Sequence, residues 1–477
     1  MDVNSAHQPP LQSPSLPLPA SASLRSNAIR PARNDDGRGV YLPVTLKFLL
    51  AFTVASLWCA FSVWLSLLWL DDLAGLIGRP LAIFVITFIA YVPGFMNAFL
   101  IMTIALDRRP ERRLLDHYPD LAILIACYNE ASNIADTIHS LSVQEYPGRM
   151  EILVLDDGST DGSVAAAHAA IQAANLQPGH DFRVVEGGHN VGKAGVLNRG
   201  LALAEADIVL TIDGDCWVYE DAIRRLVERY VSDPPGTCAV AGAVLVRNSR
   251  VNWLARAQEW DYFHGIAAVK RMQSMYHGTL VAQGAFSLYE RNALNEVGGW
   301  PDCVGEDIVL TWALLERGYR VGYCEDAVLF TNVPERLRQF ALQRKRWSRG
   351  LMEAFKHHSG LLAKARLSTL FIWWNLLFLP LDMVYTFAFL PGIVMALFGH
   401  YYIAGILTLL VLPLAAVWNY FIFRVQNSMF KRQDLKVRRN LDGFLFYVLA
   451  YSMVMQPVCV WGYVAELLGW RKRWDTK

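Results

Sequence analysis

Two aspartates one residue apart close an apolar run in the middle of the chain. Asp213 and Asp215 lie in "TIDGDCW" (211–217), directly after "ADIVL" (206–210). The apolar run predicts a strand buried on both faces, and Asp-Gly-Asp after a strand is more often a turn than a site. Paired carboxylates are, however, ligands that Mg²⁺ and Mn²⁺ prefer, usually together with phosphate oxygens. The neighbouring segments decide between a turn and a site.

Strand and helix patterns alternate around these aspartates. The predicted strands are 121–127, 151–157, 182–187 and 206–212, and the predicted helices are 130–144, 161–175 and 194–205. This alternation predicts right-handed crossovers and a mainly parallel sheet. In such a sheet, ligands bind beyond the carboxyl ends of the strands.

Acidic residues follow three of the predicted strands. The strand ends carry "CYNE" (127–130), "DDGSTDGS" (156–163) and "DGD" (213–215). Carboxylates gathered at one edge of a sheet repel each other unless a cation or hydrogen-bond donors neutralise them. A divalent metal with a nucleotide diphosphate explains all three acidic strand ends together, so we predict a site for both at this edge.

A phosphate-binding P-loop is the alternative nucleotide site. "GGHNVGK" (187–193) fits G-x-x-x-x-G-K between a predicted strand and a predicted helix. The next residue is Ala194, where a P-loop needs Ser or Thr to ligate Mg²⁺. An NTPase is therefore disfavoured, although Lys193 can still meet a phosphate as a point charge.

Two further segments have an ordinary structural interpretation beside a chemical one. "GEDIVLTWALLERG" (305–318) predicts a helix that begins with Glu306 and Asp307, where the helix dipole favours acids. "QRKRWSRG" (343–350) is basic and aromatic, as expected of a flank at a membrane surface. From these residues alone, capping is favoured over catalysis for Glu306 and Asp307, and a membrane-surface flank is the ordinary interpretation of 343–350.

Six motifs occur in an order that identifies a family. "CYNE", "DDGSTD", "GKAGVLN", "DGD", "GED" and "QRKRW" follow one another along the chain. The chain resembles the processive, membrane-embedded family 2 glycosyltransferases, which include cellulose, chitin and hyaluronan synthases, and most of all the bacterial poly-N-acetylglucosamine synthases. The resemblance covers about residues 45 to 470. It implies an α/β nucleotide-sugar-binding, GT-A-like cytoplasmic domain inserted between transmembrane α-helices.

The resemblance also implies roles for the donor-binding residues. Asp157 is similar to the aspartate that binds uracil, with Asp156 beside it supporting the nucleoside. Asp213 and Asp215 match the DxD pair, which binds Mg²⁺ or Mn²⁺ and lies near the ribose and diphosphate; which of the two binds the metal more directly stays open. Lys193 is assigned to the donor phosphates.

The remaining roles concern the reaction and the acceptor. The resemblance makes Asp307, next to Glu306, the general base that deprotonates the acceptor hydroxyl. Gln343, Arg346 and Trp347 match Q-x-x-R-W: Arg346 holds the diphosphate and Trp347 stacks on the terminal sugar of the acceptor. Gly284, in "VAQGAFSLYERNAL" (281–294), lets the backbone approach that sugar, although small residues also serve strand packing.

The composition indicates a membrane protein. Hydrophobic residues make up 54% of the chain and charged residues only 18%, and the net charge of +1 gives no attraction to nucleic acid. Seven dispersed cysteines indicate reduced thiols rather than a disulfide framework. Apolar stretches long enough to cross a bilayer occupy 44–70, 81–106, 369–398, 402–423 and 442–468.

The positions of basic residues orient these stretches. Arginines precede the first stretch and follow the second, so we predict a cytoplasmic tail and a cytoplasmic central region in a multi-pass protein of the plasma (inner) membrane. Five spans would place the C-terminus outside, which conflicts with its basic end "WRKRWDTK". The first half of 369–398, which Pro380 and Asp382 interrupt, is the candidate for an interfacial helix that does not cross. We expect four or five spans.

The expected domains follow the same boundaries. They are a disordered tail (1–43), two transmembrane helices (44–106), a glycosyltransferase domain (107–360), interfacial and transmembrane helices (361–470) and a basic tail (471–477).

The resulting prediction is a processive inverting glycosyltransferase. It polymerises a UDP-sugar, preferably UDP-N-acetylglucosamine, into a poly-β-1,6-N-acetylglucosamine-like exopolysaccharide and moves it across the membrane. The expected partners are the UDP-sugar, the growing polysaccharide, membrane lipid and a candidate small accessory subunit. The alternatives are another β-glycan synthase, of hyaluronan, chitin or cellulose type, a non-processive membrane glycosyltransferase, or a transporter or receptor with a degenerate nucleotide domain.

Overall fold

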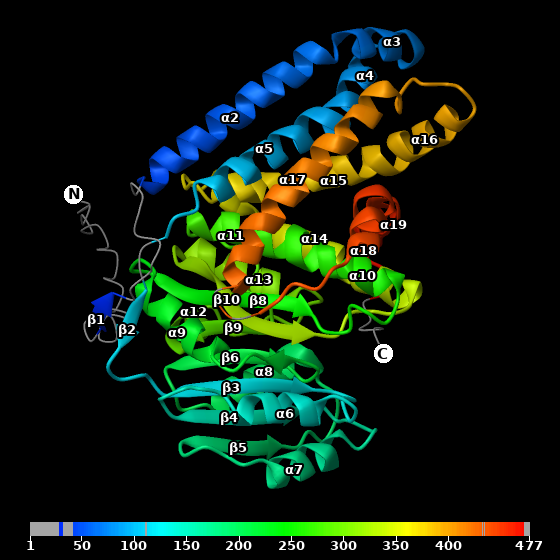
Figure 1. Cartoon of the computed structure of the whole chain (residues 1–477). Coiled ribbons are helices and arrows are strands. Elements are labelled where there is room, and N and C mark those ends of the chain that lie inside the picture. Colours follow the sequence, from blue (N-terminus) through cyan, green and yellow to red (C-terminus); the bar gives the residue numbers. More distant parts are fainter. Residues whose placement is uncertain (1–27, 32–41, 110–111, 432, 434, 472–477) are drawn as a thin grey trace, which may run out of the picture.

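The computed structural model describes residues 28–31, 42–109, 112–431, 433 and 435–471. It separates the long apolar helices from a mixed sheet, and a layer of shorter helices lies between them (Figure 1). Most of the predicted N-terminal tail and the end of the basic C-terminal tail lie outside the described residues. Within the predicted disordered tail, Ala28–Pro31 instead forms β1, because its backbone pairs antiparallel with β2 (Arg113–Leu115).

Eight strands form the main sheet in the order β5-β4-β3-β6-β9-β8-β10-β7. They are β3 (Leu121–Cys127), β4 (Met150–Asp156), β5 (His180–Val185), β6 (Ile208–Asp213), β7 (Trp217–Val218), β8 (Thr237–Val246), β9 (Phe286–Glu290) and β10 (Arg320–Thr331). The four predicted strands are β3 to β6, and they pair in parallel as expected. The sheet as a whole is mixed, because β9 runs antiparallel to β6 and β8.

The helices of the sheet domain lie against the sheet and above it. Those that follow the strands are α6 (Ile134–Ser142), α7 (Ser163–Ala173), α8 (Gly192–Leu203), α9 (Ala222–Ser232), α12 (Arg291–Glu296) and α13 (Glu306–Arg317). The layer below the apolar helices contains α10 (Trp253–Trp260), its continuation through a π-helical turn into α11 (Ala267–Met275), and α14 (Leu337–His358) (Figure 1). The helix predicted for 305–318 is confirmed, and Gly318 ends it with a left-handed φ of 102°.

Five helices are long and apolar enough to cross a membrane. They are Val44–Leu65 (α2), Arg79–Ala105 (α4 and α5), Thr369–Leu397 (α15 and α16), Thr408–Lys431 (within α17, Ile406–Lys431) and Leu441–Leu467 (α18 and α19). A shorter helix, α3 (Leu67–Ile77), makes the connection after α2. All five predicted apolar stretches are therefore helical.

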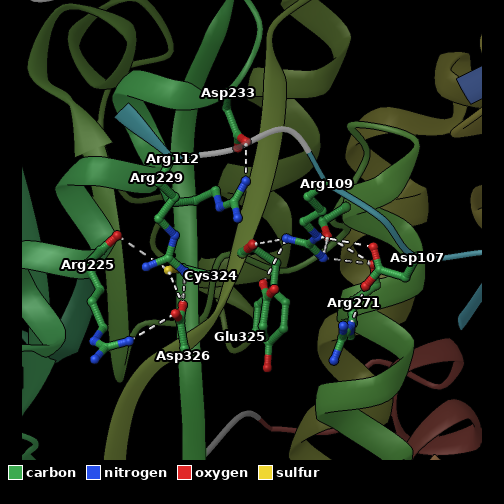
Figure 2. Close-up of polar contacts among 12 residues, drawn as sticks. Asp107, Arg109, Arg112, Arg225, Arg229, Asp233, Arg271, Cys324, Glu325 and Asp326 are labelled. Carbon is green, nitrogen blue, oxygen red and sulfur yellow. Dashed lines mark hydrogen bonds and ion pairs between the residues drawn. The ribbon is translucent and has the colours of Figure 1, made fainter. Parts of the chain in front are cut away.

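A network of buried acids and arginines joins the end of α5 to the sheet (Figure 2). Asp107, just beyond α5, pairs with Arg271 of α11, and Arg109 reaches Glu325 of β10 at 2.9 Å. Asp326, next to Glu325, pairs with Arg112 and, at 3.1 Å, with Arg225 of α9. Buried charges need such mutual compensation, so the network fixes the main sheet to the second apolar helix.

Candidate active site

Three acidic strand ends meet at one edge of the sheet, as the sequence predicts. In the register of the parallel strands, Cys127 at the end of β3 is level with Asp156 of β4, and Ala126 is level with Asp213 of β6. The segments CYNE, DDGSTDGS and DGD therefore emerge side by side. This edge is the expected ligand-binding position of a parallel α/β sheet.

Asp156 and Asp157 are both buried and hold loops at this edge. The Asp156 carboxylate accepts hydrogen bonds from the backbone N–H groups of Gly158 and Ser159, both at 3.1 Å. The Asp157 carboxylate accepts from Val191 at 2.7 Å and Gly192 at 3.1 Å. Burial raises the pKa of Asp157, and the two backbone hydrogen bonds oppose that rise. Both acids thus shape the loops where a nucleoside would bind.

Lys193 connects the strand edge to the helix α13. Its ammonium pairs with Asp213 and lies 3.8 Å from the Glu306 carboxylate. Burial opposes its charge, but these carboxylates outweigh burial and raise the pKa of Lys193. A Cβ atom on Gly284 would lie 2.9 Å from the same ammonium, so a side chain there would crowd it.

A close contact between two glycines positions α13 against α14. A Cβ on Gly305 would lie 2.4 Å from the Cα of Gly350, so these backbones approach as only glycines allow. Glu353 of α14 also accepts a hydrogen bond from the Gly305 N–H at 2.9 Å. The contact brings the first turn of α13, with Glu306 and Asp307, beside the Q-x-x-R-W segment of α14.

Glu306 and Asp307 have different surroundings although they are adjacent. Glu306 is buried, whereas Asp307 is half-buried. Burial, followed by the charge of Asp307, raises the pKa of Glu306 above its ordinary value, while the charge of Lys193 opposes that rise. Asp307 is therefore the more exposed carboxylate of the pair.

Gln343, Arg346 and Trp347 lie in the first half of α14. The charge of Arg346 is among those that act on Glu306 and on Tyr262 of the π-helical turn after α10. Trp347 is 40% exposed, and the guanidinium of Arg344 lies 4.0 Å from the centre of its ring. An exposed aromatic ring at the edge of the site is available for a sugar.

Asp213 and Asp215 fit a divalent cation together with phosphate oxygens. Both carboxylates are half-buried, so they are reachable from solvent; Asp215 accepts a hydrogen bond from Thr331 at 3.4 Å. Within the described residues no three His, Cys, Asp or Glu side chains converge as a metal cage. A site of one or two carboxylates completed by phosphates is the usual arrangement for Mg²⁺.

The sequence did not indicate the helix formed by α10 and α11, which lies over the site. Tyr262, in the π-helical turn, has its ring 6.3 Å from that of Trp347, and the charge of Lys270 interacts with that of Asp307. Both residues come from the amphipathic stretch 253–275, which matches no motif. An isolated lysine in such a stretch gives no signal in the sequence.

Comparison with known proteins identifies the class to which this domain belongs. Residues 122–298 match the family model described as glycosyl transferase family 2, so the chain contains a family 2 glycosyltransferase domain. The match includes the three acidic strand ends, Lys193 and Gly284, and it ends before Glu306. The GT-A-like fold is also that of the mannosyltransferase PcManGT from Pyrobaculum calidifontis, solved with GDP-Man and Mn²⁺, with a TM-score of 0.54 and 19% identity over 81% of this chain and 99% of that one.

Two curated relatives are similar to this chain over slightly more than half of its length. The poly-beta-1,6-N-acetyl-D-glucosamine synthase of Staphylococcus aureus (strain COL) is 31% identical over 275 residues, which are 55% of this chain and 64% of the relative. The synthase of Staphylococcus epidermidis is 30% identical over 277 residues, 56% of this chain and 65% of the relative. The similarity thus spans slightly less than two thirds of these relatives.

Proposed function

We propose that this protein is a processive inverting glycosyltransferase that polymerises UDP-N-acetylglucosamine into a β-1,6-linked exopolysaccharide and moves it across the membrane. The observation that carries the proposal is the meeting of Asp213, Lys193 and Glu306–Asp307 at the sheet edge, next to the Q-x-x-R-W segment of α14. The similarity to two poly-N-acetylglucosamine synthases supports this polymer. A synthase of another β-glycan is the second candidate.

In the proposed reaction Asp307 takes the proton from an acceptor hydroxyl. The oxygen of that hydroxyl forms a bond with the anomeric carbon of the donor sugar while the bond to the UDP oxygen breaks on the opposite face. The result is inverted configuration, a chain longer by one sugar, and UDP. A positioned base typically contributes about 10²–10⁴-fold to the rate. Glu306, which is buried and faces Lys193, supports the first turn of α13 rather than acting as the base.

The other site residues hold the two substrates. Arg346 offers a fixed fork of N–H donors to the diphosphate, and Lys193 adds a point charge. Asp213 and Asp215 would hold Mg²⁺ or Mn²⁺, which supplies charge stabilisation to the leaving diphosphate. The Mn²⁺ in the solved mannosyltransferase supports a divalent ion without choosing between the two.

The remaining assignments concern the nucleoside and the acceptor. Asp156 and Asp157 shape the nucleoside site through the loops that they hold. Trp347 stacks on the terminal sugar of the acceptor, since its apolar ring suits the C–H face of a pyranose. Gln343 lies one helical turn before Trp347, and Gly284 leaves room next to Lys193.

We also propose that the protein lies in the plasma membrane with its catalytic domain in the cytoplasm, and that four of the five apolar helices cross. Both ends of the fifth, Leu441–Leu467, contact charged residues of the catalytic domain. At its start, Asp442 pairs with Arg256, in the first turn of α10, at 2.9 Å. At its end, Glu466 pairs with Arg349 and Lys356 of α14, at 3.0 and 2.7 Å. A helix whose two ends both contact the catalytic domain, on one side of the membrane, cannot cross the membrane. This helix therefore lies at the membrane surface.

This arrangement resolves the conflict between five spans and the basic C-terminus, because four spans bring the C-terminus back to the cytoplasm. The interfacial helix is then the last apolar stretch and not the first half of 369–398. The helix of that first half instead packs antiparallel against the second span. Phe371 lies beside Phe99, with ring centres 6.3 Å apart, and Val384 shares an apolar cluster with Ile86.

A radiolabelled-sugar assay tests the proposed function. Purified protein in lipid is incubated with UDP-N-acetylglucosamine, UDP-glucose or UDP-glucuronic acid, and both released UDP and polymer are measured. We expect polymer from UDP-N-acetylglucosamine. Polymer from another donor alone would favour the second candidate, and no turnover with any donor would contradict both. An acceptor glycan, further membrane lipid and a candidate small accessory subunit are then added one at a time. This shows which of them polymer synthesis also requires.

A further inference from the structure

A buried arginine lies against the exposed ring of Trp347. The guanidinium of Arg344, three residues earlier on α14, lies over this ring at 4.0 Å from its centre. Arg344 is buried, whereas Trp347 is 40% exposed. The guanidinium covers one face of the indole, so a sugar can contact only the part of the ring that remains exposed.

The guanidinium of Arg344 is held by a closed triangle of polar contacts. Its Nη2 lies 2.8 Å from Oδ2 of Asp261 and donates to the hydroxyl of Tyr451 at 3.0 Å. That hydroxyl donates in turn to the same oxygen of Asp261 at 3.0 Å. All three side chains are buried. A charge-assisted network of this kind has a defined geometry, so it holds the guanidinium, and the ring stacked on it, in one orientation.

The three members of the triangle come from three different parts of the fold. Arg344 belongs to α14, Asp261 begins the π-helical turn after α10, and Tyr451 lies in the helix that we place at the membrane surface. The residue after Asp261 is Tyr262, whose ring centre is 6.3 Å from that of Trp347. The triangle therefore fixes both rings at this edge of the site and connects them to the surface helix.

The ordinary interpretation of the triangle is a structural joint between α14 and the surface helix. That joint already has a buried ion pair, between Arg349 and Glu466 at 3.0 Å. What distinguishes Arg344 is that its guanidinium lies against the ring assigned to the acceptor. A ring that is fixed before the sugar arrives loses less freedom when the sugar binds, and this raises the affinity.

We propose that Arg344, held by Asp261 and Tyr451, is a positioning residue that fixes the Trp347 ring for the acceptor sugar. The inference rests on the proposed function, since it takes Trp347 as the ring on which the acceptor stacks. Arg344 does not touch the sugar and acts only through the ring. Stacking of a cation on an aromatic ring changes an affinity by about 2- to 30-fold, so loss of the stacking should weaken acceptor binding by this factor and leave donor binding unchanged.

The first variant is Arg344→Lys, in full-length protein in lipid. It keeps the positive charge that buried Asp261 needs, but removes the flat guanidinium that pairs with a carboxylate while it lies on a ring. The probe is a short β-1,6-linked N-acetylglucosamine oligosaccharide, and released UDP is measured. We expect the KM for the oligosaccharide to rise about 2- to 30-fold. The KM for UDP-N-acetylglucosamine, and kcat at saturating oligosaccharide, should stay at the wild-type values.

The second variant is Tyr451→Phe, which gives an answer if Arg344→Lys does not fold. It removes one hydroxyl from the triangle and leaves the ion pair of Arg344 with Asp261 in place. We expect the KM for the oligosaccharide to rise in this variant too, by less than in Arg344→Lys, again without a change in the KM for UDP-N-acetylglucosamine.

The matched control is Tyr463→Phe, on the same helix as Tyr451. The hydroxyl of Tyr463 also donates to a buried carboxylate, that of Asp382 at 2.9 Å, so this variant loses a comparable hydrogen bond outside the triangle. We expect wild-type KM values for both substrates. An equal rise of the KM for the oligosaccharide in Tyr463→Phe and Tyr451→Phe would overturn the proposal, because the effect would then not depend on the triangle.

The remaining outcomes separate this inference from the proposed function. Wild-type protein that turns over no UDP-sugar, or Trp347→Ala with a wild-type KM for the oligosaccharide, contradicts the proposed function. If Trp347→Ala raises this KM while Arg344→Lys and Tyr451→Phe leave it unchanged, the positioning role of Arg344 alone is wrong. A lower Tm with both KM values raised together indicates a purely structural joint and also contradicts the positioning role.

Discussion

Gly305 and Gly350 touch backbone to backbone, and this contact joins the acidic pair to the helix of the Q-x-x-R-W segment. A Cβ on Gly350 would lie 2.8 Å from the Cα of Gly305, so alanine there must push α14 away from α13. We expect Gly350→Ala to lower polymer synthesis strongly, since displacements of about 1 Å near reacting groups can cost about 10²-fold.

The control for this variant is Gly75→Ala, because a Cβ on Gly75 meets no atom within 4 Å. Rates of UDP release by the two purified variants check the prediction. Wild-type rates for Gly350→Ala, in protein with a wild-type Tm, would show that the two helices need no close contact.

Removal of the metal-binding carboxylate tests the assigned cation site. Asp215→Asn should abolish polymer synthesis, and excess EDTA should do the same to the wild-type protein, with activity restored by Mg²⁺ or Mn²⁺. The physical reason is that half-buried Asp215 is one of two carboxylates at the edge where phosphate would complete the coordination. Full activity of the wild-type protein in EDTA would rule the metal out.

Trp347 is expected to keep the growing chain bound between additions. Trp347→Ala should retain UDP release but give short chains, because stacking of this kind contributes roughly 1–3 kcal/mol in base–aromatic systems. The readout is the ratio of polymer to UDP. Trp253→Ala is the matched control, since Trp253 is 54% exposed and packs on Phe446 of the last apolar helix. An unchanged ratio and chain length for Trp347→Ala would exclude an acceptor role.

The side of the membrane that holds the C-terminus tests the assignment of four spans. A fluorescent reporter that matures only in the cytoplasm should be active after residue 477, and a reporter active only outside should be silent. The contacts of Glu466 with Arg349 and Lys356 predict this result. The same two reporters inserted at Leu76, between the first two apolar helices, are the control. There the outside reporter should be active and the cytoplasmic reporter silent. A C-terminus found outside would mean that Leu441–Leu467 crosses after all.

The sequence predicts best what depends on local patterns. The strands β3 to β6 follow from apolar runs, and the first turn and C-cap of α13 follow from its acids and Gly318. The antiparallel strand β9 was not predicted, because its place between β6 and β8 depends on long-range pairing. The contact of Gly305 with Gly350 joins segments far apart in sequence, so no local pattern indicates it.

The most direct test of the central claim compares transfer with donor binding in Asp307→Asn. This variant keeps the shape of the side chain and removes the base, so transfer from UDP-N-acetylglucosamine should fall by about 10²–10⁴-fold while the donor still binds. Asp302→Asn, at an exposed aspartate just before α13, should behave as wild type. If Asp307→Asn loses donor binding in parallel with transfer, or transfers sugar at the wild-type rate, Asp307 is not the base.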